Sequence, residues 1–198
     1  LDWLENWLQT EGSDLRVFCN SVTDYWATIT ISGPSSRELL SEITDIELDG
    51  KEFSFMDWRQ GNVGGIPARV FRISFTGELS YEINVQANYA GAIWDVLMEH
   101  GEKFDICPYG TETMHILRAE KGFIIVGQDT DGSVSPQDLG LGWAITKHKQ
   151  FSFLGERGME RSDIMRSERK QLVGLKTHDP EIILEEGSQL VFDPKQEK

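Results

Sequence analysis

The clearest pattern in the chain is an alternation of side chains on both sides of a short polar break. Residues 69–75 place one set, Phe71, Ile73 and Phe75, on one side, and a second set, Val70, Arg72 and Ser74, on the other. After the break, Tyr81, Ile83 and Val85 alternate with Glu82 and Asn84. The intervening Thr-Gly-Glu-Leu-Ser has the length and glycine content of a longer hairpin loop. The pattern therefore predicts a β-hairpin over residues 69–85.

This hairpin could present the carboxylate of Glu82 beside an aromatic ring. A carboxylate next to a ring suits a flat heterocycle that carries donor nitrogens. A solvated carboxylate on the wet face of an antiparallel strand, with phenylalanine on the dry face, is equally ordinary. Alternation alone leaves both interpretations open.

The rest of the chain up to residue 122 shows further helix and strand signals. Helices are predicted where apolar residues recur with helical spacing: at residues 1–8, 37–40, 88–102 and 111–121, the last beginning near Thr111 and ending at Gly122. Strands are predicted at residues 15–18, 26–31 and 53–55. The order of these elements indicates an α+β fold, with antiparallel sheets and packed helices.

The C-terminal third has a different character. Residues 123–143 are rich in Gly, Asp, Ser and Pro, and an irregular stretch of this length is more often functional than accidental. A polar helix is predicted at 154–166, and strands at 171–175 and 189–192. We therefore expect a first domain over residues 1–147. Residues 148–198 would form a linker helix and the incomplete start of a small β-barrel-like domain.

Composition narrows the classes of function. At 198 residues and 39% hydrophobic content, the chain can bury a substantial core. A formal net charge of −14 argues against binding to nucleic acid or to anionic membranes. No apolar run approaches the roughly 20 residues that span a bilayer, and the first residues lead us to expect no export signal. Two distant cysteines without a CxxC pair favour a reducing compartment, so a cytoplasmic protein is expected.

Several common chemistries lack support in the sequence. The four histidines are too dispersed for a metal site, and neither HExxH nor GxSxG occurs. The glycines of residues 61–67 match no phosphate-binding pattern and precede a strand, so they are interpreted as a turn. The residues alone thus predict an acidic α+β domain with a pocket near Glu82 and the loop of residues 127–142.

Three ordered motifs give a more specific indication. Residues 75–82 are similar to Tyr-Thr-Gly-Glu-Asp-Gly-x-Glu, and residues 33–37 to Gly-Pro-x-Ser-Arg after a strand. Residues 117–143 resemble a run of Leu-Arg-Leu-Glu-x-Gly, Gly-x-Asp, Pro and Gly-Leu-x-Trp. Together these motifs resemble the folate-binding aminomethyltransferase family, which includes the T-protein of the glycine cleavage system.

Within this family, residues 72–82, 109–115 and 122–132 are most similar to the folate-binding region of heterotetrameric sarcosine oxidase α subunits, with dimethylglycine dehydrogenases next. The resemblance implies oxidative demethylation of sarcosine to glycine. It also implies transfer of the one-carbon unit to tetrahydrofolate, giving 5,10-methylenetetrahydrofolate. Tetrahydrofolate is the implied cofactor here, with FAD, FMN and NAD bound elsewhere in the enzyme. The implied partners are the other subunits of a hetero-oligomer.

The resemblance also implies roles for particular residues. Glu82 matches the glutamate that grips the pterin, since a carboxylate can accept two parallel N–H bonds from an aminopyrimidinone edge. Phe75 replaces a tyrosine that lies against the folate, so stacking is kept and a hydroxyl is lost. Met114 stands where the family has a folate-contacting arginine, so the anchor is expected to be weaker or to come from another residue such as His115 or Arg118.

The family's catalytic aspartate is expected upstream of Leu1, and a further arginine downstream of Lys198. We therefore expect an interior piece of a longer subunit, inactive by itself and without a catalytic residue of its own. Two alternatives remain open. One is a non-catalytic structural or interaction module of the same fold, favoured by the changes at Phe75 and Met114. The other is a free-standing aminomethyltransferase that acts on a lipoyl carrier protein.

Overall fold

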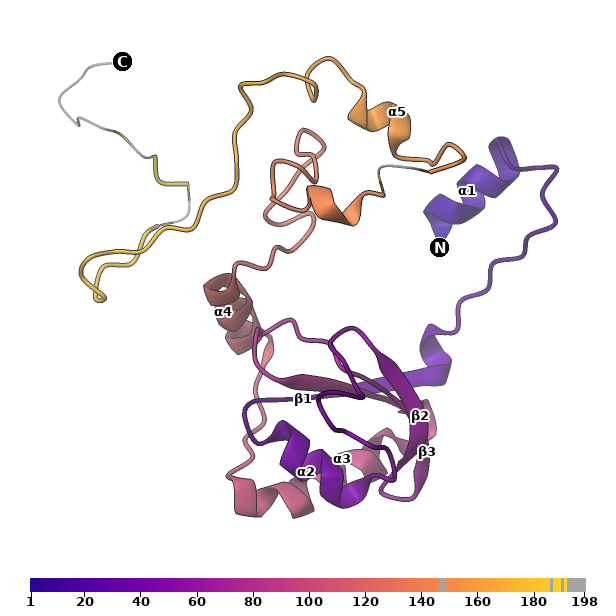
Figure 1. Ribbon diagram of the computed structural model, residues 1–198, viewed down its shortest axis with the longest axis vertical. Coiled ribbons are helices and arrows are strands. Elements are labelled where there is room, and N and C mark those ends of the chain that lie inside the picture. Colours follow the sequence, from indigo (N-terminus) through magenta and orange to yellow (C-terminus); the bar gives the residue numbers. More distant parts are fainter. Residues whose placement is uncertain (147–148, 186, 190, 192–198) are drawn as a thin grey trace. The chain divides into compact units, whose positions relative to one another are not determined.

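A computed structural model describes residues 1–146, 149–185, 187–189 and 191 of the chain (Figure 1). The chain divides into two compact units, Leu1–Phe123 and Ile124–Lys198. The first unit contains a sheet with packed helices. The second consists mainly of turns and loops.

A four-stranded antiparallel sheet forms the centre of the first unit, with the strand order β1-β4-β3-β2. The strands are β1 (Trp26–Ser32), β2 (Trp58–Val63), β3 (Ile66–Phe71) and β4 (Ser80–Gln86). Gly64 and Gly65 join β2 to β3, and both have the positive φ that a two-residue hairpin turn requires. Residues 72–79 form the longer loop between β3 and β4. This order leaves β1 as an edge strand.

Four helices belong to the first unit: α1 (Asp2–Thr10), α2 (Ser36–Ile43), α3 (Ala90–Gly101) and α4 (Thr111–Lys121). The second unit contains α5 (Glu156–Met159). Short 3₁₀ turns occur at η1 (Thr23–Tyr25), η2 (Ala87–Tyr89), η3 (Glu102–Phe104) and η4 (Gly142–Ala144). α2 and α3 lie together on one face of the sheet (Figure 1). That face is therefore the buried one.

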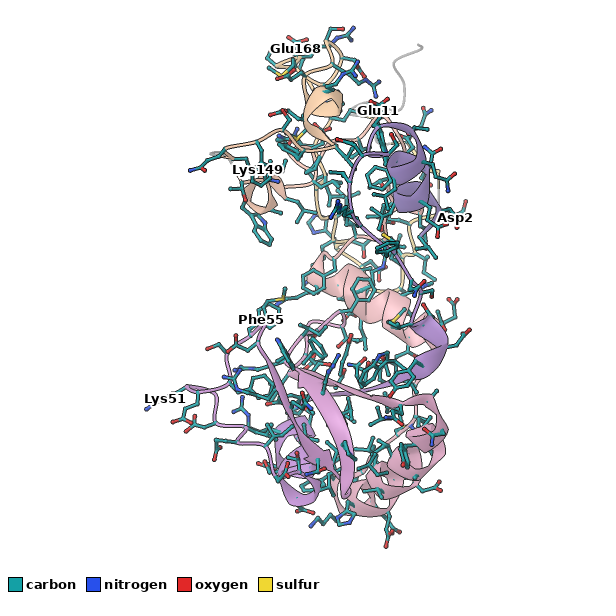
Figure 2. All side chains as sticks on the ribbon, turned by 90° about the vertical axis from the view of Figure 1, so that its right-hand side faces the viewer. Asp2, Glu11, Lys51, Phe55, Lys149 and Glu168 are labelled. Carbon is teal, nitrogen blue, oxygen red and sulfur yellow. The ribbon has the colours of Figure 1, made fainter. Side chains whose placement is uncertain are left out.

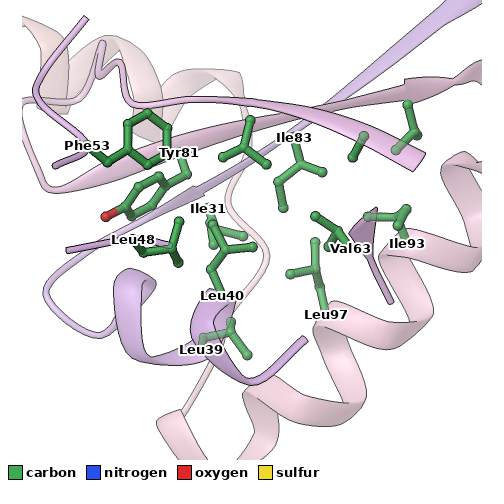
Figure 3. Close-up of a cluster of buried hydrophobic side chains, with 13 residues drawn as sticks. Ile31, Leu39, Leu40, Leu48, Phe53, Val63, Tyr81, Ile83, Ile93 and Leu97 are labelled. Atoms are coloured by element: carbon green, nitrogen blue, oxygen red, sulfur yellow. The ribbon is translucent and has the colours of Figure 1, made fainter. Parts of the chain in front are cut away.

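The hydrophobic core fills the space between the sheet and these two helices (Figure 3). The helices supply Leu39, Leu40, Ile93 and Leu97, and the strands supply Ile31, Val63, Ala68, Val70, Tyr81, Ile83 and Val85. Burying one such aliphatic side chain contributes roughly 1.5–3 kcal/mol. The loop between α2 and β2 adds Leu48 and Phe53 to the core, whereas Lys51 points into solvent (Figure 2).

Tyr81 is fully buried, and Arg37 of α2 provides a partner for its hydroxyl. Arg37 Nε donates a hydrogen bond to Tyr81 Oη at 3.0 Å. A buried hydroxyl without a partner is costly, so this bond explains how a polar group is tolerated inside the core. The expectation that Tyr81 faces away from Glu82 is confirmed.

The predicted hairpin is present. In its first strand, however, the phenylalanine does not lie on the buried face, as the interpretation with a dry phenylalanine face had it. Val70 is fully buried in the core, whereas Phe71 lies half-buried on the opposite face. Phe71 is the cross-strand partner of Glu82. Either residue could have filled the core, because both are apolar and adjacent positions of a strand alternate between faces.

Other predicted elements are changed. Residues 15–18 and 53–55 form no strand, and the helix expected over 154–166 is reduced to the four residues of α5. Neither 15–18 nor 53–55 has a pairing partner in the sheet, and an apolar run without one has no ladder to join. The strand at 26–31 and the helices at 1–8, 37–40, 88–102 and 111–121 are confirmed within a few residues.

In the second unit, a carboxylate clamp joins two loop segments. Arg169 Nε donates to Asp138 Oδ1 at 2.8 Å, and Arg169 Nη1 donates to the Asp163 carbonyl at 2.7 Å. The backbone N–H and hydroxyl of Ser135 both donate to Asp138 Oδ2 at 2.8 Å. Donation from Arg169 is the main reason why the pKa of the buried Asp138 carboxyl lies well below its ordinary range.

The strand predicted at 171–175 is absent, and the segment runs as loop. Its expected partner, 189–192, lies partly outside the described residues. The division between the compact units falls after residue 123, and the boundary predicted after residue 147 stays a prediction. Within the described part of the chain, every helix is too short or too polar to cross a lipid bilayer.

Candidate functional site

The sheet has an outer face, which is the face turned away from α2 and α3. Its residues follow from the strand register and the alternation of burial, and the central strand β4 contributes Glu82 and Asn84 to it. The neighbouring strands contribute Trp26, Thr28, Thr30, Trp58, Gln60, Arg69 and Phe71. This face combines aromatic, hydroxyl, amide and charged groups.

Glu82 lies near the middle of the outer face. Its cross-strand partners are Thr30 on β1 and Phe71 on β3. Among the residues that the structure describes, none forms a hydrogen bond or an ion pair with the side-chain carboxylate of Glu82. Partial burial raises the pKa of its carboxyl above the ordinary value. A half-buried carboxylate without a partner is the kind of group that marks functional sites.

Two aromatic rings lie in the same row of the sheet as Glu82, on the neighbouring strand β3 and on β2 beyond it. Phe71 and Trp58 are cross-strand partners, and their rings stack with centroids 6.0 Å apart and planes inclined by 22°. Further along the sheet, the guanidinium of Arg69 lies 4.7 Å from the ring centre of Trp26. Stacked and cation–π pairs of this kind hold side chains in fixed positions.

The hydroxyl of Thr28 completes the polar part of the outer face. It donates a hydrogen bond to Asn84 Oδ1 at 2.6 Å, which joins the edge strand to β4. The donor capacity of Thr28 is therefore used within the protein. Glu82, one row further along β4, has no such contact.

Phe75 belongs to the loop between β3 and β4 and not to a strand. It is 36% exposed, and its ring stacks on Phe123 with centroids 6.2 Å apart and an interplanar angle of 16°. The structure thus pairs Phe75 with Phe123, the residue after the C-cap of α4. The role predicted for Phe75 against folate stays a prediction.

Close backbone packing brings the same loop to the last turn of α4. Gly77 has φ +85°, and a Cβ atom there would lie 2.8 Å from Cγ and Cδ of Lys121. A side chain at position 77 would therefore be strained by its backbone and would also meet the lysine stem. The glycine of the Thr-Gly-Glu motif allows this approach.

Met114 and Arg118 both lie on α4. Arg118 is buried, and its Nη1 donates to the carbonyl of Phe123 at 3.1 Å, while Phe123 N donates back to the Arg118 carbonyl at 2.9 Å. Met114 and His115 are half-buried on the preceding turn. Gly122, in the left-handed conformation at φ +84°, ends the helix as predicted.

A cavity of about 580 Å³ lies at the other side of β1, between this edge strand, α3 and residues 104–109. Trp94, Met98 and Tyr109 are among its lining residues, and Tyr109 Oη lies 3.4 Å from Ser32 Oγ. None of the predicted site residues lines this cavity. Among the described residues, no group of three His, Cys, Asp or Glu side chains could hold a metal ion.

Sequence reasoning missed Phe71, Trp58 and Thr30 as neighbours of Glu82. Alternation did place Phe71 on the side of its strand opposite Val70, but the hairpin loop is too long to fix the register. Trp58 and Thr30 come from strands whose pairing only the three-dimensional structure reveals.

Comparison with known protein families agrees with this architecture. Residues 1–149 match the model of the GCVT N-terminal domain. The chain belongs to this family. The family resemblance expected from the sequence motifs is thereby confirmed.

Individual members of the GCVT family show similarity over most of the chain. The sarcosine oxidase α subunit of Corynebacterium sp. (strain P-1) is 48% identical over 195 residues, which are 98% of this chain and 20% of that protein. The corresponding subunit of Rhizobium meliloti is 35% identical over 193 residues, 96% of this chain and 19% of that protein. The aminomethyltransferase of Halothermothrix orenii is 32% identical over 171 residues, 86% of this chain and 46% of that protein.

The chain spans about one fifth of the length of the sarcosine oxidase relatives it matches. Among solved structures, a heterotetrameric sarcosine oxidase from Corynebacterium sp. U-96 is similar, with a TM-score of 0.45 and 20% identity. That similarity covers 56% of this chain and 53% of the other.

Proposed function

We propose that this chain is the tetrahydrofolate-binding part of a sarcosine oxidase α subunit. The enzyme would oxidise sarcosine to glycine and transfer the released one-carbon unit to tetrahydrofolate, giving 5,10-methylenetetrahydrofolate. The observation that carries the proposal is Glu82, a half-buried carboxylate without a partner on the outer face of a GCVT-family domain. The 48% identity to a sarcosine oxidase α subunit supports the choice of enzyme.

Glu82 would hold the pterin through charge-assisted hydrogen bonds. Its ionised carboxylate has two acceptor oxygens, which match the two parallel N–H donors of an aminopyrimidinone edge. These bonds favour the ionised form, against the burial that raises the pKa of Glu82. Phe75, Met114 and Arg118 are proposed as further contacts of the folate.

The remaining parts of the activity are proposed to lie outside these 198 residues. They are the catalytic aspartate, the sites for FAD, FMN and NAD, and the other subunits of a hetero-oligomer. A cytoplasmic location is proposed from the cysteine usage and the acidic composition.

A titration of the complete native protein with tetrahydrofolate, under anaerobic conditions in a calorimeter, tests the proposal. Glu82→Gln should raise the Kd roughly 10- to 100-fold, because it removes a charged acceptor from a paired hydrogen bond. Glu78→Gln is the matched control, because Glu78 is an exposed glutamate of the neighbouring loop. Equal affinities in all three proteins would exclude Glu82 as the pterin clamp.

Two alternatives have their own support. The 32% identity to an aminomethyltransferase favours the aminomethyltransferase activity of the glycine cleavage system. The cavity beside β1, whose lining does not include Glu82, favours a structural or interaction module of the same fold. Failure of the wild-type protein to bind tetrahydrofolate would support the module. Folate binding without sarcosine oxidation would support the aminomethyltransferase.

A further inference from the structure

We propose that the cavity beside β1 holds an extended segment of the same subunit, which lies outside these 198 residues and adds a strand to the sheet. The occupant would be a short strand with apolar side chains on one face and polar side chains on the other. The inference goes beyond the proposed function, because it concerns neither folate nor Glu82.

The two edges of the sheet differ in how they are covered, and the edge at β2 is closed. Asp45 N donates to the Asn62 carbonyl at 3.3 Å, and Asn62 N donates to Asp45 Oδ1 at 2.6 Å. A Cβ atom at Gly61 would lie 2.5 Å from Cγ1 of Ile46, so the covering segment packs directly against the strand. Residues 43–46 therefore leave no room for another strand beside β2.

The edge at β1 is open. Its residues pair with β4, and within the described part of the chain no further hydrogen bond reaches the backbone of residues 28–32. In an antiparallel pair, every second residue of an edge strand directs its N–H and C=O away from its neighbour. The cavity lies along this edge, since all five residues line it although their side chains alternate between the two faces. An open edge of this kind is a template for another strand.

The walls of the cavity match the two faces of an added strand. On the helical face of the sheet, Trp94 and Met98 of α3 line the cavity, and its inner end reaches the core residue Leu97 (Figure 3). On the outer face, Thr28 and Thr30 of β1 are exposed. Because successive side chains of a strand point to opposite faces, the occupant would alternate apolar and polar residues.

The space suits one strand better than a second copy of this chain. Residues 104–109 line the cavity opposite β1, and Tyr109 Oη lies 3.4 Å from Ser32 Oγ. A second copy would bring its own residues 104–109 in front of its own β1, so two such segments would have to share the space. A single strand of five residues, about 17 Å long, matches the length of the open edge.

The length of the relatives supports a segment of the same subunit as the occupant. The chain spans 20% of one sarcosine oxidase α subunit and 19% of another, so about four fifths of a subunit of that length would lie outside it. A segment of the same polypeptide has a high effective concentration at the edge, which a separate peptide lacks. The complete subunit would thus cover its own open edge.

Hydrogen exchange of the complete native protein, resolved to single amides, tests whether a strand covers β1. If it does, every amide of residues 28–32 should exchange roughly 100-fold or more slowly than in an unstructured peptide, because both edges of β1 are then hydrogen-bonded. Asn62, on the closed edge of β2, is the internal reference. Protection of alternate amides only is the pattern of an open edge strand and would overturn the proposal.

Photo-cross-linking of the complete native protein identifies the occupant. The photoreactive residue p-benzoylphenylalanine in place of Tyr109 should join to one segment outside these 198 residues, with the subunit mass unchanged on a denaturing gel. The same residue in place of Tyr89 is the matched control. Tyr89 is 39% exposed, against 40% for Tyr109, and is not among the residues that line the cavity. The control should not reach that segment.

The remaining outcomes each overturn the proposal. A cross-link at position 109 that adds the mass of another polypeptide would make a second copy or another subunit the occupant. Cross-links that are absent, confined to residues 1–198, or equal at position 89 would exclude the added strand. If replacing Tyr109 lowers the thermal midpoint, Trp94, which also lines the cavity, is replaced instead. Neither measurement involves Glu82, so their failure is distinct from failure of the folate titration.

Discussion

Arg169 grips Asp138 across 31 residues of sequence, with Nε 2.8 Å from one carboxylate oxygen and 3.0 Å from the other. The carboxylate is buried and also accepts two hydrogen bonds from Ser135. The described part of the second unit has little regular structure beyond α5 and η4. The conformation of the second unit therefore depends on contacts between its loops, and on the bond between Arg169 and Asp138 in particular.

Replacing Asp138 by Asn should loosen the second unit and reduce its acid sensitivity. The folded-state pKa of Asp138 is depressed, so its carboxylate stabilises the fold above about pH 4, the ordinary range of an unfolded aspartate. That contribution is lost as the pH falls further. Hydrogen exchange over residues 133–172 should be faster in Asp138→Asn at pH 7, with a smaller further change towards pH 3. The matched control, Glu168→Gln, changes an exposed acidic side chain of the same segment and should leave exchange unaltered.

Removing the hydroxyl of Tyr81 should destabilise the first unit by roughly 1–2 kcal/mol. Tyr81→Phe keeps the buried ring but deletes the acceptor of the Arg37 hydrogen bond, and bonds to charged groups contribute about this much. The loss is limited because Arg37 is partly exposed and can turn to water. Urea denaturation measures the effect. Tyr25→Phe, at an exposed tyrosine, serves as the control, and an equal loss there would contradict the argument.

A side chain at position 77 should destabilise the contact between the β3–β4 loop and α4. Gly77→Ala costs about 1–2 kcal/mol in backbone strain, because an alanine tolerates a positive φ poorly. The approach to the Lys121 stem adds a steric cost. Gly65→Ala has a similar positive φ with open space around it and measures the strain alone. Equal free energies of unfolding for the two variants would show that Lys121 simply moves aside.

The charge of Glu82 should reduce the stability of the unliganded protein at neutral pH. Burial raises its folded-state pKa, so the folded state binds the proton more tightly than the unfolded state. The cost is absent below the unfolded pKa, about 4.3, and is complete above the folded pKa. Glu82→Gln should therefore be slightly more stable than wild type at pH 7, with the difference disappearing near pH 4. Thermal midpoints across this range test it, and a difference independent of pH would be the contrary result.

Much of the first unit could be predicted because the apolar residues of its strands and helices recur with a clear period. Tyr81, Ile83 and Val85 alternate with polar residues, so the buried face of β4 was unambiguous. α3 and α4 have helical spacing, and Gly122 marks the end of α4. The same alternation placed Glu82 on the opposite face, but its role was indicated only by the family resemblance.

The surroundings of Glu82 could not be predicted, because they depend on which strands become neighbours. Val70 and Phe71 are both apolar, so the pattern did not decide which one fills the core. Trp58 is 13 residues from Phe71 in the sequence and Thr30 is 52 residues from Glu82, although each pair is directly opposed in the sheet. Long-range pairing of this kind depends on the fold as a whole and not on local propensity.

Adjacent residues of β4 have different roles, because they lie on opposite faces of the sheet. Positions 81, 83 and 85 are constrained by the volume of the core, and positions 82 and 84 are free of that constraint. Substitutions at the outward positions can therefore change which ligand the outer face binds and leave the packing of the core unaltered, since each substitution affects one face only. A family that keeps this sheet can acquire new ligand preferences through a few outward positions, and its members would then differ most at residues that contribute least to folding.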